Sequence, residues 1–471
     1  MVSREKEYVL QNRWKLEGKS LIYFGIRKQP NVNKNRIKLK SKEVVFFENF
    51  LRGMYDEEDK IFIKFLRAGI VVPENGYLTT PKNLDEATYC KSCIANNYII
   101  PGIEFDDDGL CPICADKDKP LNDSILPVKN TFDEIDKAYK KGRFDVALFY
   151  TGGKDSTYLL HYLSRELGLK VLALTLEIPS LSNNARQSIE NAKRIFKNAE
   201  FVSRSIAEAE LNAMYNKLFE LQNNICACIS LAHAVFYPLL VSERAPYLVL
   251  GNEPAQMSGL YYNRVGPKIA YLYRKYKIFS VLLNIGRLCL LKKPLRSGQR
   301  EMLLLVKQLA YGDHFVKKIA GFRNQLISNV CESMDFIPNL KNTLKTAIKR
   351  SDRRAAMPSL IHIDMNEISE NGVYDHEKIK GFLISECGYV APERKTKSMH
   401  SSCSLEAAKD YSQFVSFYNM ESQMIPFSAL ELIIASSKKN INREIALAEL
   451  KFSFVLERPE VHVEMEKYAK R

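Results

Sequence analysis

A glycine-rich turn between a buried strand and a helix constrains this fold more than any other stretch of the sequence. The turn, residues 151–156, reads Thr-Gly-Gly-Lys-Asp-Ser and follows the apolar run 144–150, which is typical of a strand buried on both faces. A helix is predicted to follow and to end at Gly168. Further strands, with helices between them, are predicted at 171–176, 200–202 and 247–250. Because such alternation requires right-handed crossovers, we expect an α/β fold built on a parallel sheet.

The same turn has the features of an anion-binding loop. Glycines let the backbone turn tightly and approach a ligand without a Cβ in the way, and the N-terminus of the following helix directs N–H groups and a partial positive charge at it. Lys154 adds a full charge, and Thr151, Ser156 and Thr157 add hydroxyl groups. The segment therefore predicts a phosphate cradle. It is not a Walker A loop, because that motif has a glycine where Leu148 stands.

The turn resembles the Ser-Gly-Gly-Lys-Asp-Ser loop of the PP-loop ATP pyrophosphatases, or adenine nucleotide alpha hydrolases, with Thr151 in place of the first serine. The resemblance implies a Rossmann-like sheet of the PP-loop (HUP) type. It also implies that the loop grips the β- and γ-phosphates of ATP while a substrate oxygen attacks the α-phosphate. Asp155 or Glu253 would hold Mg²⁺, and Lys154 and Asp155 would be catalytic. The implied ATP-binding residues are Thr151, Gly152, Gly153, Lys154, Asp155, Ser156, Leu174, Thr175, Gly251, Asn252 and Glu253.

Two Cys-x-x-Cys pairs precede this region and predict a metal site. Cys90 and Cys93 form the first pair, and Cys111 and Cys114 form the second, with 17 residues between the pairs. Four thiolates satisfy tetrahedral Zn²⁺ and leave no open position, so we expect structural zinc. An iron–sulfur cluster is the alternative that the spacing does not favour.

The residues between the two pairs carry a second resemblance. The segment 103–111 is similar to the zinc knuckle of the N-acetyl sugar amidotransferases, which make amidine groups on surface polysaccharides and place this knuckle just before the PP-loop. Knuckle and loop together cover roughly residues 88–255 of this chain. The resemblance implies a sugar substrate, free or lipid-linked, and a separate glutaminase subunit as the source of ammonia.

Other cysteines are candidates for sulfur chemistry. Cys226 and Cys228 precede the predicted helix 230–243, and PP-loop sulfurtransferases carry a cysteine in a comparable place. Cys403 lies in a serine-rich loop and is a further candidate. For each of these thiols the alternative is a buried small hydrophobe. Cys289 and Cys331 lie on apolar helical faces and are expected in the core.

The charge of the chain is concentrated in one segment. Lys and Arg number 69 against 55 Asp and Glu, a formal charge of +14. Residues 263–330 hold 14 of the cations and only Glu301 and Asp313 as acids, so 14 minus 2 gives +12 there. Apolar residues interleave at helical spacing, which suits an anionic membrane surface or an acidic partner. A solvated helix face and RNA are the alternatives, although no RNA-binding motif accompanies the charge.

Residues 1–19 are polar and lack the apolar region of a secretory signal, and the apolar stretch 278–291 is too short and interrupted to span a bilayer. We therefore expect a cytoplasmic protein, with peripheral attachment to the inner face of the membrane as a refinement. The predicted divisions are a small winged-helix-like unit at 1–85, a zinc knuckle at 86–120, an ATP-binding domain at 140–260, a basic helical insertion at 261–355 and a mostly helical C-terminal part of the catalytic region at 356–471.

Three functions follow from these patterns. The first is an ATP-dependent enzyme that adenylates a carbonyl or carboxyl oxygen and transfers nitrogen to it. The second keeps the adenylation but transfers sulfur to a tRNA base or a biosynthetic amide through Cys226 or Cys228. The third is a basic, non-catalytic protein that binds a membrane or RNA and retains a vestigial nucleotide loop.

Overall fold

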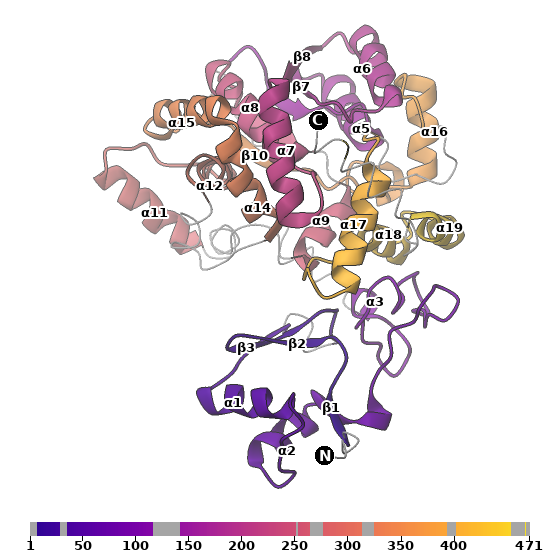
Figure 1. The fold of residues 1–471 in the computed structure, drawn as a ribbon. Helices are drawn as coiled ribbons and strands as arrows, with labels where there is room; N and C mark the ends of the chain where they lie inside the picture. Colours follow the sequence, from indigo (N-terminus) through magenta and orange to yellow (C-terminus); the bar gives the residue numbers. More distant parts are fainter. Residues whose placement is uncertain are drawn as a thin grey trace.

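The computed structural model describes residues 7–28, 35–115, 142–250, 253–263, 277–312, 325–392, 402–453 and 467. Its centre is a parallel sheet of five strands in the order β10-β9-β6-β7-β8 (Figure 1). The strands are β6 (Val146–Phe149), β7 (Val171–Glu177), β8 (Ala199–Ser205), β9 (Tyr247–Leu250) and β10 (Ser359–His362). The parallel sheet predicted from the alternation is therefore present. β8 is longer than predicted, and β10 was not predicted because its short apolar run gives little signal.

Both faces of the sheet are covered by helices, which explains the unbroken apolar character of its strands. Ala147 and Phe149 point to one face, whereas Val146 and Leu148 point to the other. The first face packs against α7 (Glu208–Gln222), α8 (Cys228–Ser242), α12 (Gln299–Tyr311), α14 (Gln325–Ser333) and α15 (Pro338–Asp352). The second packs against α5 (Lys154–His161), its π-helical continuation η3 (Tyr162–Glu166), α6 (Asn183–Ile195) and α16 (His376–Glu386).

Part of the basic segment belongs to this core, through α12 and the start of α14. Met302, Val306 and Leu309 of α12 are fully buried in the cluster that covers the first face, as is Leu344 of α15. These helices are thus not set apart from the sheet domain, because their apolar sides complete its packing. α11 (Lys277–Cys289) differs from them, and Figure 1 shows it at the periphery of the helical layer.

The N-terminal residues form a smaller α+β unit with its own aromatic core. β2 (Trp14–Glu17), β3 (Ser20–Tyr23) and β4 (Arg36–Lys38) make an antiparallel sheet, and β1 (Tyr8–Leu10) pairs with β5 (Val71–Pro73). α1 (Ser41–Phe50) and α2 (Lys60–Arg67) pack through Phe47 and Phe65, whose rings meet edge to face at 4.7 Å. A short 3-10 turn, η1 (Glu74–Gly76), follows.

The C-terminal helices surround the cysteine-bearing segment. α17 (Glu406–Tyr418), α18 (Phe427–Ser437) and α19 (Arg443–Ser453) share one buried cluster with the cysteines, with the short α3 (Pro112–Ala115), and with Ala255 at the start of α9 (Pro254–Tyr262). The remaining elements are the 3-10 turns η4 (Met334–Phe336) and η5 (Glu370–Gly372). Across the described ranges, no helix has both the length and the apolar character needed to cross a bilayer.

Arg13 joins the N-terminal unit to the C-terminal helices. Its guanidinium is buried and donates hydrogen bonds of 2.7 Å to the carbonyl oxygens of Phe24, Phe417 and Tyr418. It also lies 5.2 Å from the centre of the Phe417 ring. The bonds to Phe24 and Phe417 are buried, and the carbonyl of Phe417 also accepts from the N–H of Met420 at 3.1 Å. Arg13 therefore stabilises this contact with three charge-assisted hydrogen bonds, two of them shielded from water.

Arg13→Ala should therefore lower the free energy of unfolding by roughly 3 kcal/mol, since it removes three charge-assisted hydrogen bonds, including the buried one to the carbonyl of Phe24. Thermal unfolding followed by circular dichroism measures the change. Lys15→Ala is the matched control, because Lys15 reaches the carbonyl of Met420 from an exposed position. Equal melting temperatures for the two variants would contradict the proposed role of Arg13.

Candidate functional site

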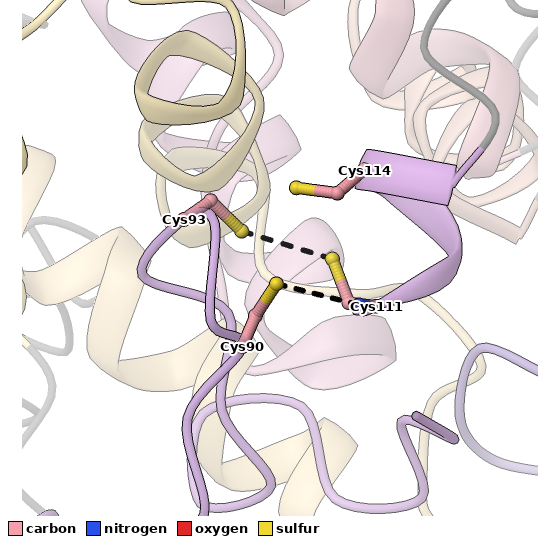
Figure 2. Close-up of side chains that lie close together, drawn as sticks. All are labelled: Cys90, Cys93, Cys111 and Cys114. Carbon is pink, nitrogen blue, oxygen red and sulfur yellow. Dashed lines mark hydrogen bonds between the residues drawn. The ribbon is translucent and has the colours of Figure 1, made fainter. Parts of the chain in front are cut away.

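The four predicted cysteine ligands come together in the structure. The sulfur atoms of Cys90, Cys93, Cys111 and Cys114 all lie within 4.8 Å of one another and are buried (Figure 2). The sulfurs of Cys93 and Cys111 are 3.7 Å apart. A tetrahedral zinc site with Zn–S bonds of about 2.3 Å places its sulfurs about 3.8 Å apart. The cluster could thus hold a metal ion, and its dimensions are compatible with zinc.

Backbone amides support the thiolate form of these ligands. The N–H groups of Ser92 and Cys111 approach the Cys90 sulfur at 3.4 Å and 3.3 Å, and that of Ala95 approaches the Cys93 sulfur at 3.3 Å. Such bonds stabilise negative charge on sulfur and fix the direction of the ligands. The turn before Cys111 is closed by Gly109, which has a φ of +77°. All four positions of a tetrahedral ion would be filled by protein, so the arrangement is structural in kind.

The cluster is also part of the fold around it. The sulfur of Cys114 lies 3.2 Å from the hydroxyl oxygen of Ser437 in α18. Cys90, Cys93 and Cys111 are fully buried in the core that the C-terminal helices complete. Within the described residues it is the only group of three or more metal-ligating side chains this close together.

The predicted phosphate loop lies at the carboxyl edge of the sheet. It connects β6 to α5, and the next central strand, β9, is followed by Glu253. The chain runs outward from β6 to β7 and β8 and then returns to β9 and β10 on the other side of β6. The strand order therefore reverses between β6 and β9. In open parallel sheets this is the position at which a ligand-binding crevice forms.

Contacts within the loop fix its shape. The hydroxyl oxygens of Thr151 and Ser156 lie 3.3 Å apart, and Ser156 and Thr157 donate to the carbonyl of Gly153 at 3.1 Å and 2.8 Å. Gly152 has a φ of +68°, and a Cβ there would lie 2.3 Å from the carbonyl oxygen of Ala185. This glycine is thus required by the close approach of the loop to α6, whatever the loop binds.

Lys154 points into a buried cluster of polar groups. Its side chain is 2% exposed. The ammonium nitrogen lies 2.7 Å from Asp155 Oδ1, 3.0 Å from the hydroxyl of Tyr374 and 3.8 Å from Glu253 Oε2. Burial opposes the charged form of Lys154, but the carboxylates of Asp155 and Glu253 outweigh it and raise the pKa of the lysine. Lys154 therefore stays protonated, with its ammonium group placed between two carboxylates.

Tyr374 and His376 complete this cluster, and sequence reasoning missed both. His376 Nε2 lies 2.8 Å from Glu253 Oε2, and the hydroxyl of Tyr374 donates to Asp155. Burial, followed by the charges of Asp155 and Glu253, raises the pKa of Tyr374 well above its usual value. Their separation in sequence from the loop leaves no local signal. The tyrosine-x-histidine pattern at the start of α16 would indicate a site only if its partners, Asp155 and Glu253, were already known.

The other predicted nucleotide contacts are less exposed than expected. Leu174 is buried in the core, and the hydroxyl of Thr175 donates to the carbonyl of Tyr150 at 2.8 Å. These two side chains are therefore already engaged inside the protein. Gly251 and Asn252 lie outside the described residues.

The candidate cysteines Cys226, Cys228 and Cys403 are half-buried, and Cys403 lies near the loop. Leu181 forms an isolated β-bridge with Cys403, and a Cβ on Gly153 would lie 3.7 Å from Ser402. A hydrogen bond to Cys228 and the charge of Lys409 lower the pKa of the Cys226 thiol against the effect of burial. Burial raises the pKa of Cys403 to about 11. Of these three thiols, Cys226 thus has the environment that most favours the thiolate, beside a half-buried Lys409 that also pairs with Glu406.

The two cysteines expected in the core differ. Cys331 is buried as expected, whereas Cys289 is exposed, so the expectation for Cys289 was wrong. Cys289 lies on α11, whose apolar residues face outward instead of inward.

No family model matches the chain, and no curated protein matches it either. The likeness to PP-loop enzymes therefore depends on the loop and knuckle residues themselves. The sheet order and the gathered cysteines are observations independent of that likeness.

The purified chain should contain about one zinc ion, measured by atomic absorption, because four buried thiolates match tetrahedral Zn²⁺. Cys90→Ser and Cys111→Ser should lower the zinc content and the melting temperature, since metal binding contributes to folding. Cys331→Ser is the matched control, as Cys331 is a buried cysteine of another cluster. Full zinc content in both knuckle variants would refute the assignment.

Proposed function

We propose that this chain is a PP-loop ATP pyrophosphatase that adenylates a carbonyl or carboxyl oxygen and transfers nitrogen to the activated carbon. The observation that supports it is the position of residues 151–156 between β6 and α5. The loop and Glu253 flank the reversal of strand order, where nucleotides bind in sheets of this kind. A Rossmann-like fold of the PP-loop type is part of the proposal.

In the proposed reaction the substrate oxygen attacks the α-phosphorus of ATP. A bond forms between that oxygen and phosphorus, the bond to the bridging oxygen breaks, and pyrophosphate leaves. Ammonia then attacks the activated carbon, the carbon–oxygen bond breaks, AMP leaves, and the nitrogen loses a proton. The protein contributes mainly by positioning the reactants and by placing charges where they stabilise the transition state.

Lys154 and the start of α5 are suited to hold the leaving pyrophosphate. The first amides of a helix have no acceptor within it and favour an anion. The ammonium of Lys154 pairs with Asp155 and lies near Glu253. A bound phosphate would therefore replace these carboxylates as the partner of Lys154. The same two carboxylates offer the oxygen ligands that Mg²⁺ prefers, and Mg²⁺ would neutralise phosphate charge there.

The choice of nitrogen and of a surface-polysaccharide sugar rests on the knuckle resemblance. Four cysteines that could hold a metal ion, packed in one cluster with Ala255 two residues after Glu253, support an enzyme of that arrangement. Ammonia would then come from a separate glutaminase subunit.

The proposal predicts that the chain converts ATP to AMP and pyrophosphate in the presence of ammonium and an N-acetylated sugar. Lys154→Ala should reduce pyrophosphate release by about a hundredfold or more, because it removes the charge that stabilises the leaving group. Ser156→Ala, a milder change, should reduce ATP affinity with the fold intact. Lys193→Ala on the exposed face of α6 is the control. Formation of ADP and phosphate instead would exclude α-phosphate attack.

A second candidate function is sulfur transfer, which the position of Cys226 favours. The Cys226 thiol has a pKa lowered by Cys228 and Lys409, and its charge acts on Cys403, whose neighbour Ser402 lies against Gly153 of the loop. The outer sulfur of a persulfide on Cys226 could attack the adenylated carbon, with AMP as the leaving group. The thiolate of Cys228 would then attack the inner sulfur on Cys226, so that the S–S bond breaks, the product keeps the outer sulfur and a Cys226–Cys228 disulfide forms. Each further turnover would need a thiol reductant for that disulfide and a persulfide donor to recharge Cys226.

The two functions are separated by Cys226→Ser and Cys228→Ser. If nitrogen is transferred, both variants should retain wild-type activity, because ammonia needs no thiol carrier. Loss of activity in Cys226→Ser, with Cys387→Ser unaffected, would favour sulfur transfer. Mass spectrometry of the product distinguishes an oxygen replaced by NH from an oxygen replaced by sulfur.

A further inference from the structure

The helix α11 is turned with its polar side toward the protein and its apolar side toward solvent. Ser280, Asn284 and Arg287 face inward beside one apolar residue, Leu283, and Arg287 is 6% exposed. The outward side holds apolar residues whose exposed fractions are 55% for Val281, 52% for Ile285 and 55% for Leu288, and Leu291, just after the helix, is 76% exposed. A helix on the surface of a water-soluble domain normally has the opposite orientation.

Specific polar contacts hold α11 in this orientation. Asn284 exchanges two hydrogen bonds with the backbone of Leu295, at 3.1 Å and 2.9 Å. The guanidinium of Arg287 donates to Asp352 Oδ1 at 2.7 Å and to the carbonyl of Asp352 at 2.6 Å. Because buried ion pairs and amide bonds of this kind are directional, the helix cannot rotate to bury its apolar side without losing them. The exposure of the apolar face is therefore fixed by the contacts on the opposite side of the helix.

A basic cavity lies beside the apolar face. It has a volume of about 490 Å³ and is lined by Lys292, Lys307, Lys349 and Arg353, with Asp352 as its only acidic lining residue among those described. Lys292 and Lys307 lie 2.8 Å and 3.1 Å from Asp352 Oδ2. Burial opposes ionisation of Asp352, but its hydrogen bonds to Lys292 and Arg287 hold its pKa well below the usual range. One carboxylate thus meets more cations than it can neutralise.

We propose that α11 and this cavity form a docking surface for an anionic lipid bilayer. The apolar side chains would enter the boundary between head groups and acyl chains, and the cavity would take a lipid phosphate. A second copy of the chain fits less well, because a symmetric contact would bring like charges together at Lys292, Lys293 and Arg296. The proposal is independent of the reaction catalysed and places the protein at a membrane surface.

Vesicle co-sedimentation of the full chain tests the proposal. The chain should bind vesicles of phosphatidylcholine and phosphatidylglycerol at least about tenfold more tightly than vesicles of phosphatidylcholine alone, and salt should weaken the binding. Replacing Val281, Ile285 and Leu288 together by serine should lower the affinity for anionic vesicles by about tenfold or more. Replacing Lys293, Lys349 and Arg353 by glutamine should reduce the preference for anionic lipid.

Matched controls separate the surface from general effects of composition. Val45, Leu78 and Ile384 are similarly exposed apolar residues elsewhere, and their replacement by serine should leave vesicle binding unchanged. Lys38, Lys42 and Arg67, replaced by glutamine, serve as the charge control. Circular dichroism confirms that each variant is folded. The proposal is overturned if anionic vesicles are not bound, if the controls lose binding equally, or if the α11 serine variant only abolishes a concentration-dependent dimer in analytical ultracentrifugation.

Discussion

Burial of the parallel sheet on both faces is the constraint on which the rest of this structure depends. Strands without a solvated face must be apolar throughout, and helices must follow each strand to cover the two sides. The same requirement brings the carboxyl ends of β6 and β9 together at one edge. It also brings α12 of the basic segment, and α15 after it, into the core, because the first face would otherwise be left open.

The candidate site is assembled from segments that share only this edge. Lys154 and Asp155 come from the loop, Glu253 from the turn after β9, and Tyr374 and His376 from the start of α16. Their charges are coupled in a buried setting, where an ammonium held by two carboxylates stays ionised. A phosphate bound here would pair with Lys154 in place of Asp155 and Glu253. The four-cysteine cluster has a different role, because its side chains lie inside a core closed by helices from the C-terminal part of the chain.

The cations of the basic region fall into two groups, one buried and paired and the other exposed. Arg287 points inward and forms a buried ion pair with Asp352, whereas Lys349 and Arg353 are exposed at the rim of the cavity. Such a division cannot be read from net charge, which counts both kinds alike. The proposed bilayer contact uses this remaining charge together with the exposed apolar face of α11, because an anionic lipid surface attracts cations to its head groups and accepts apolar side chains below them.

Local patterns in the sequence determined much of this protein. Apolar runs and the glycine-rich turn predicted the strands and the parallel sheet, and the Cys-x-x-Cys spacing predicted the four cysteines that gather where they could hold a metal ion. These predictions succeed because the physical cause acts within a few residues, through periodicity, chain reversal or ligand spacing. Only the tertiary structure decided the fifth strand, the partners of Lys154 and the outward face of α11. The reason is that each depends on groups from distant parts of the chain, such as Asp352 for Arg287, and no short segment encodes which partner will arrive.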